Sequence, residues 1–137
     1  MPGRRVEGDF VIKIAVLVFI GGALGAVLRE FLMRVVPTLA DGFPLDILAA
    51  NLVAACLLGF IAALHERKGA SDSIYALLGT GITGGLSTFS SFAYASAMLM
   101  KASLASAVVA FAYVLTSLVL GYIAVIVGMK IGGITKS

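Results

Sequence analysis

Four long apolar segments, separated by short polar turns, constrain this chain more than any other feature of its sequence. They run from about Phe10 to Val35, from about Ile47 to Leu64, from near Ser73 to a turn at Lys101, and from about Leu104 to Met129. Each can supply the roughly 20 residues that a helix needs to cross the hydrocarbon layer of a membrane. We therefore expect an all-α integral membrane protein in which residues 1–137 form a single domain of four transmembrane helices.

Composition supports a membrane protein and argues against several functional classes. The chain is 61% apolar and 12% charged, whereas a soluble domain carries about 25% charged residues. Its ten basic residues are scattered instead of clustered on one face, so its net charge of +3 does not indicate nucleic-acid binding. The acidic residues all lie at segment ends or in loops, which disfavours proton-coupled transport through an embedded carboxylate. No nucleophile–base pair or metal-ligand cluster lies within the spans, so we do not expect an enzyme.

The third segment contains the unusual stretch GTGITGGLSTFSSF, from Gly79 to Phe92. Glycine costs about 1 kcal/mol in a helix interior, and broken backbone survives in a membrane only where protein or water satisfies its polar groups. Such breaks often form ion sites. We expect non-helical backbone between about Gly81 and Thr88, interrupting the helix through Gly84 and Gly85, and an ion or solute pathway beside it. The alternative is that the glycines form only a packing face, as Gly21, Gly22 and Gly25 are expected to do in the first segment.

The polar groups within the spans are neutral amides and hydroxyls, which suit a small, strongly hydrated anion. Phe89 and Phe92 lie three residues apart and share a helix face. The positive edge of a phenyl ring can face an anion without binding it tightly, although two phenylalanines at this spacing more often belong to a core. Arg29 is the most embedded charge, and it could act either as an interface anchor or in a vestibule of the pathway.

Four motifs, in order and at similar spacing, resemble those of the small bacterial Fluc (CrcB-type) fluoride channels. They are GGALGAVLRE ending near Arg29, FPLDILAANLVAACLLG with Asn51, TGITGGLSTFSSF, and AYVLTS with Tyr113 and Ser117. The resemblance covers nearly the whole chain. It implies a fluoride-selective channel subunit of the inner (plasma) membrane, which exports fluoride passively from the cytoplasm and gives fluoride resistance.

The resemblance also implies an assembly and a set of site residues. An antiparallel dimer would hold two fluoride pathways and one central, structural sodium ion. Phe89 and Phe92 would present ring edges to the anion, with polar contacts from Asn51, Thr88, Tyr113 and Ser117 and a vestibule charge from Arg29. Main-chain carbonyls near Gly84 and Ser87 of each subunit would hold the sodium.

The chain departs from the pattern of this family in ways that bear on transport rate and assembly. Asp46-Ile47 replaces the usual Gly-Thr, and Ser91, Ala93 and Ala95 replace a threonine, a serine and a common glutamate. The basic residues are also unevenly distributed. Arg29, Arg34 and Lys101 lie on one side, whereas the side with both termini holds Arg4, Arg5, Lys13, Arg67, Lys68, Lys130 and Lys136.

This excess favours a cytoplasmic N-terminus, whereas an antiparallel homodimer needs both orientations of one sequence. We favour the homodimer, with a heterodimer of two related subunits as the alternative. For function, the alternatives are a small multidrug-type transporter, which would need an embedded glutamate, and a non-conducting assembly subunit, which would have an unbroken third helix.

Overall fold

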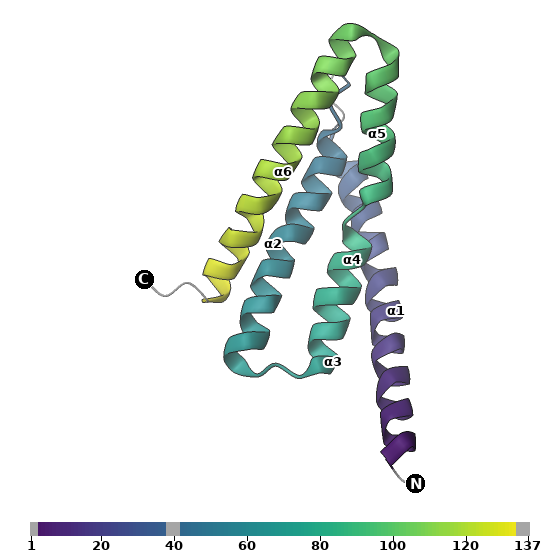
Figure 1. The fold of residues 1–137 in the computed structure, drawn as a ribbon, viewed down its shortest axis with the longest axis vertical. Coiled ribbons are helices and arrows are strands. Elements are labelled where there is room, and N and C mark those ends of the chain that lie inside the picture. The colour runs from purple at the N-terminus through teal and green to yellow at the C-terminus, as the bar shows by residue number, and fades with distance from the viewer. Residues whose placement is uncertain (1–2, 38–41, 134–137) are drawn as a thin grey trace.

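The computed structural model describes residues 3–37 and 42–133, and almost all of them are helical. The elements, in chain order, are α1 (Gly3–Val35), α2 (Leu45–Lys68), α3 (Asp72–Ile74), the π-helix η1 (Tyr75–Ile82), α4 (Thr83–Leu86), α5 (Phe89–Ala102) and α6 (Leu104–Gly132). In Figure 1, α1, α2, the run from α3 to α5, and α6 point alternately up and down along the long axis. Asp41 and Lys136 lie outside the described residues, as do the side chains of Arg4, Arg5 and Lys68.

Three of these helices are long and apolar enough to cross a membrane, over Gly8–Val35, Leu45–Arg67 and Leu104–Gly132. They confirm a multi-pass, all-α membrane protein. The remaining expected segment is divided among α3, η1, α4 and α5, which we call the broken third run. These elements follow one another in the same direction. Of these, η1 and α4 lie against α1 and α2, whereas α5 lies beside α6 (Figure 1).

Glycines allow the broken third run to lie directly on the backbone of α1. A Cβ atom added at Gly25 would overlap the main chain of Ile82 and Leu86, and one added at Gly85 would overlap the main chain of Gly22. The predicted close approach at the first-segment glycines is therefore present. The prediction that Gly84 and Gly85 interrupt the helix is wrong, because both residues are helical within α4.

A second glycine contact joins α2 to α6 on the opposite side of the molecule. A Cβ atom added at Gly59 would overlap the main chain of Val125, and one added at Gly128 would overlap that of Cys56. Small residues allow helix backbones to approach closely without a hydrophobic driving force. The α2–α6 pair and the α1–third-run pair together hold α2 beside the third run (Figure 1).

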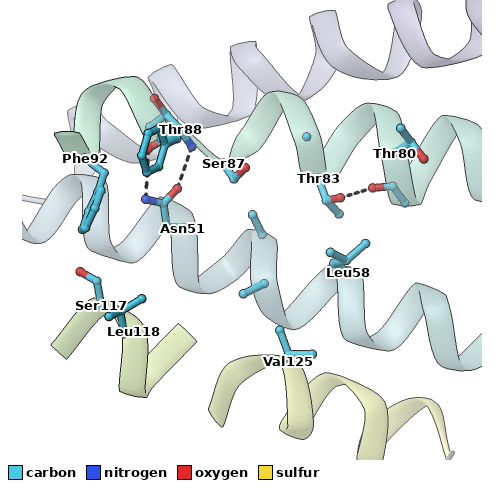
Figure 2. Close-up of a pocket in the computed structure, with 15 residues that line it drawn as sticks. Asn51, Leu58, Thr80, Thr83, Ser87, Thr88, Phe92, Ser117, Leu118 and Val125 are labelled. Atoms are coloured by element: carbon cyan, nitrogen blue, oxygen red, sulfur yellow. Dashed lines mark hydrogen bonds between the residues drawn. The ribbon is translucent and has the colours of Figure 1, made fainter. Parts of the chain in front are cut away.

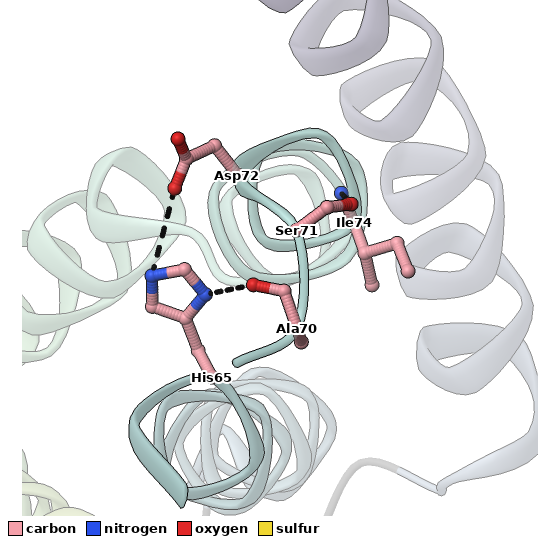
Figure 3. A network of polar contacts seen from close by, with 5 residues as sticks. All are labelled: His65, Ala70, Ser71, Asp72 and Ile74. Atoms are coloured by element: carbon pink, nitrogen blue, oxygen red, sulfur yellow. Dashed lines mark hydrogen bonds and ion pairs between the residues drawn. The ribbon is translucent and has the colours of Figure 1, made fainter. Parts of the chain in front are cut away.

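The turn between α2 and α3 is ordered by His65 (Figure 3). One imidazole nitrogen, Nδ1, lies 2.7 Å from the carbonyl oxygen of Ala70, and the ring lies against that of Tyr75 with 4.7 Å between centroids. Nε2 lies 3.8 Å from a carboxylate oxygen of Asp72. The hydroxyl of Ser71 accepts a hydrogen bond from the N–H of Ile74 at the start of α3. These contacts fix where the third run begins relative to α2.

Candidate functional site

The helical interruption lies at Ser87 and Thr88, between α4 and α5. Both residues are extended, with ψ of 154° at Ser87 and φ, ψ of −145°, 108° at Thr88. The Thr88 hydroxyl accepts a hydrogen bond from the N–H of Ser91 at 3.2 Å, and so caps α5. Threonine and serine are favoured at this capping position. The predicted break within residues 81–88 is therefore present, but it lies at Ser87 and Thr88 and not at the glycine pair.

Asn51 of α2 satisfies the backbone that this break leaves open. Its Oδ1 accepts a 2.7 Å hydrogen bond from the Thr88 N–H, and its Nδ2 donates to the Thr88 carbonyl at 3.4 Å. Figure 2 shows the amide facing Thr88 from the neighbouring helix. Thr88 is only 5% exposed, and buried backbone groups are costly when unpaired. Asn51 therefore takes the place of the helical acceptor that the Thr88 N–H lacks, whereas the Thr88 carbonyl also accepts from the Phe92 N–H at 3.4 Å.

Arg29 of α1 binds the same break from the opposite side. Its Nη1 donates to the carbonyl of Gly85 at 3.0 Å and to that of Ser87 at 3.4 Å. The last carbonyls of a helix have no partner within the helix, and the C-terminal end carries partial negative charge. The half-buried guanidinium of Arg29 thus supplies both hydrogen bonds and charge to the end of α4.

An open groove of about 560 Å³ runs along α2, the third run and α6 (Figure 2). Seven of the sequence-predicted site residues line it, namely Asn51, Gly84, Ser87, Thr88, Phe89, Phe92 and Ser117. Tyr113 and Arg29 are not among its lining residues. Thr80 and Thr83 also line it, although the sequence argument did not place them in the site. Their spacing from Ser87, in steps of three and four residues, could have revealed this shared helix face.

A row of aromatic rings leads from the groove into the protein interior. Phe89 and Phe92 are in contact, with centroids 6.0 Å apart, and Phe92 lies 5.3 Å from Tyr113. Phe43 meets Tyr113 edge-on at 5.4 Å. Phe89 is 79% exposed, whereas Tyr113 is fully buried. Among the described residues, the Tyr113 hydroxyl has no hydrogen-bond partner.

The other polar side chains of the site already donate within the chain. Ser117 donates to the carbonyl of Tyr113 at 2.7 Å, and Thr88 donates to the Ser91 hydroxyl at 3.0 Å. Both hydroxyls would have to rotate before donating to an ion. Within the described ranges, no group of three His, Cys, Asp or Glu side chains could hold a metal ion. The oxygen atoms that remain here are main-chain carbonyls and the side-chain amide and hydroxyl oxygens of the groove.

The positions at which the chain departs from the expected motifs are spread around this site. Asp46 is half-buried in the first turn of α2, and Ile47 beside it is buried. Ala93 is exposed on α5, and Ala95 and Ser91 are half-buried. None of these residues except Ser91 makes a polar side-chain contact with the capping hydroxyl of Thr88.

Comparison with known proteins gives a consistent result. Residues 16–129 match the family model described as "CrcB-like protein, Camphor Resistance (CrcB)". A Brucella abortus protein named fluoride-specific ion channel FluC 1 is 55% identical over 122 residues, which are 89% of this chain and 45% of that protein. Proteins named FluC 3 in Yersinia pseudotuberculosis and FluC in Ignicoccus hospitalis are 46% and 41% identical. The aligned regions cover 88% and 85% of this chain, and 89% and 92% of those proteins. The chain thus spans less than half of the Brucella relative but most of the other two.

Proposed function

The chain belongs to the CrcB-like family, and from this membership we propose that it is a subunit of a fluoride-selective channel. It would release fluoride passively from the cytoplasm across the plasma membrane and so give fluoride resistance. Relatives from bacteria and an archaeon carry the name fluoride-specific ion channel, and ion channels are not a class of enzyme. The observation that carries the proposal is a polar break beside an open groove in an otherwise apolar helical protein.

We propose that fluoride passes along the groove at the level of the aromatic row. The edges of Phe89 and Phe92 would face the anion, which suits the positive edge of a phenyl ring. The buried hydroxyl of Tyr113 is an available donor beside Phe92. As fluoride loses water molecules, it would gain polar contacts from Asn51, Thr88 and Ser117. Arg29 would add positive charge beside the break. The broken third run disfavours a non-conducting assembly subunit. A multidrug-type transporter would need a glutamate within a span, and the sequence places none there.

A structural sodium ion, held by the main-chain carbonyls of Gly84 and Ser87, is compatible with these residues. The Thr88 N–H donates to Asn51, so it does not complete a helical bond to the Gly84 carbonyl. The Ser87 carbonyl accepts only a long 3.4 Å bond from Arg29, and a carbonyl oxygen has a second lone pair. Both residues line the open groove. When bound, the ion would neutralise carbonyl partial charge at the break.

We propose that the third run completes a fourth membrane span and that two subunits assemble in antiparallel orientation. Thr80, Gly84, Ser87 and Ser90 are exposed along the third run, and polar groups facing lipid are costly. A second copy of the chain would cover them together with Phe89. A heterodimer with a related subunit of opposite orientation would do the same. Mapping the sidedness of a terminal tag distinguishes these assemblies, since near-equal orientations are expected for the homodimer and a single orientation for the heterodimer.

Efflux from liposomes containing the purified chain tests the proposed function. We expect rapid fluoride efflux and little chloride efflux. Phe89→Ile and Phe92→Ile should each reduce fluoride efflux by at least about tenfold, because a lost contact of 1.4 kcal/mol corresponds to that factor. Phe19→Ile is the matched control, since Phe19 has the same 79% exposure as Phe89 but lies on α1. Equal chloride and fluoride efflux would contradict selectivity, and no efflux of either would contradict the channel.

A further inference from the structure

Arg29 is a positively charged side chain bound directly to the backbone on which the proposed sodium site depends. Its Nη1 donates to the carbonyl of Gly85 at 3.0 Å and to the carbonyl of Ser87 at 3.4 Å. The first carbonyl belongs to the residue directly after Gly84. The second is itself one of the two carbonyls proposed to hold sodium. The protein thus already places one cation at the carbonyls where a second cation would bind.

The two contacts of Arg29 differ in quality, and its charge has no side-chain partner. The 3.0 Å bond to Gly85 is within the usual range for an N–H···O hydrogen bond, whereas the 3.4 Å contact with Ser87 is beyond it. In the described part of the chain, the neighbouring carboxylate of Glu30 pairs with Arg34, and no ion pair includes Arg29. The guanidinium is therefore held firmly at Gly85, is held loosely at Ser87, and keeps its positive charge beside the break.

We propose that Arg29 competes with sodium at the break and so sets the sodium concentration at which the site fills. The inference rests on the proposed function, because it concerns the affinity of the sodium site proposed there. Sodium and the guanidinium would share the Ser87 carbonyl, and each would weaken the interaction of the other with that oxygen. Two unit positive charges within several ångströms of each other near a protein surface also repel strongly enough to lower a binding constant by about tenfold or more.

A purely structural role of Arg29 predicts the opposite change in sodium affinity. If the guanidinium only held the Ser87 carbonyl in place, its loss would disorder that ligand and weaken sodium binding. Under competition, Arg29→Gln removes the charge but keeps an amide donor, so sodium should act at a concentration at least about tenfold lower than in the wild type. Arg29→Lys keeps the charge but lacks the planar fork, so the concentration should fall by only about threefold.

Thermal unfolding of the full chain in detergent measures sodium binding without depending on fluoride transport. A ligand that binds only the folded protein raises its stability according to the ratio of ligand concentration to dissociation constant. Sodium chloride is titrated while choline chloride keeps the ionic strength constant, for the wild type, Arg29→Gln, Arg29→Lys and the control Arg34→Gln. Arg34 has a 77% exposed side chain on the same helix and pairs with Glu30. Its substitution removes an equal charge away from the break and should leave the half-maximal sodium concentration within about twofold of the wild type.

The outcomes separate the inference from the sodium site on which it rests. A half-maximal sodium concentration in Arg29→Gln equal to or above that of the wild type overturns the inference alone. If Arg29→Gln does not unfold cooperatively, Arg29→Lys decides by the same criterion. An equal fall in Arg34→Gln also overturns the inference, because the position of the charge would then not matter. Absence of sodium-dependent stabilisation in all four proteins overturns the sodium site and the inference together, whereas stabilisation only in the Arg29 variants supports both. Fluoride efflux from liposomes tests the channel independently of these results.

Discussion

Replacing Asn51 by leucine tests whether this side chain holds the break in the third run. Leucine has the same branched shape as asparagine, but it is larger and has neither its donor nor its acceptor. The change therefore removes the 2.7 Å bond to the Thr88 N–H and the 3.4 Å bond to the Thr88 carbonyl while keeping a branched side chain at this position of α2. Thr88 is 5% exposed, so water has little access to the amide that is left.

The expected cost follows from the unequal quality of these two bonds. A buried donor left without a partner costs about 1–3 kcal/mol, and this applies to the Thr88 N–H. The 3.4 Å contact lies beyond the usual range for an N–H···O bond and adds little. We therefore expect Asn51→Leu to lower the free energy of unfolding by about 2–3 kcal/mol. Because α5 begins at Phe89, directly after Thr88, the local order of its first turn should fall as well.

Thermal unfolding in detergent and hydrogen exchange of the Thr88 amide measure these two effects. Asn51→Asp should retain much of the exchange protection, because a carboxylate oxygen can still accept from the N–H. Ser117→Ala is the matched control, since Ser117 also lines the groove but donates only to Tyr113 within its own helix. That control should change stability by less than about 0.5 kcal/mol. Wild-type protection of the Thr88 amide in Asn51→Leu would refute the assignment, whatever happens to fluoride flux.

Two further changes test the packing that positions the break. Gly25→Ala places a methyl group against the main chain of Ile82 and should lower the free energy of unfolding by about 1–3 kcal/mol. Gly22→Ala places its methyl group in open space and should leave that free energy unchanged or raise it by up to about 1 kcal/mol. Equal thermal stability of the two variants would contradict this packing. His65→Ala removes the contacts to Ala70 and Tyr75 and should lower stability by about 1 kcal/mol. Proteolysis at the α2–α3 turn should then accelerate, and an unchanged cleavage rate would show that the imidazole does not order it.

The fold was largely predictable because membrane helices leave a strong signal in hydropathy. The observed α1, α2 and α6 contain the predicted segments. One end of α1 and one end of α6 coincide with the prediction, and the other ends extend beyond it by about half a turn to two turns. The first begins at Gly3 and not Phe10, because polar residues before an apolar run can continue a helix outside the hydrocarbon. The π-helical winding of Tyr75–Ile82 had no recognisable sequence signal. It belongs to a segment whose backbone lies directly on α1 at Gly21 and Gly81.

The candidate site was predictable in its residues but not in its connections. Asn51, Thr88, Phe89, Phe92 and Ser117 do line one groove. Their partners could not be read from helical spacing, because the contact from Asn51 to Thr88 joins residues 37 positions apart. The same limit applies to Arg29, whose bond to the Gly85 carbonyl spans 56 positions. Periodicity indicates which residues share a face of one helix, and it carries no information on which face of another helix they meet.

The break in the third run depends on two other helices as much as on its own sequence. Glycine makes a broken helix less costly, yet Gly84 and Gly85 remain helical because their segment is packed along α1. Thr88 can start a new helix with its hydroxyl, but this leaves its own N–H and the carbonyls of Gly85 and Ser87 to be satisfied. Asn51 from α2 and Arg29 from α1 bind these groups from opposite sides. The break is therefore stabilised by α1 and α2 together, since broken backbone survives in a membrane only where protein or a water-filled cavity satisfies its polar groups.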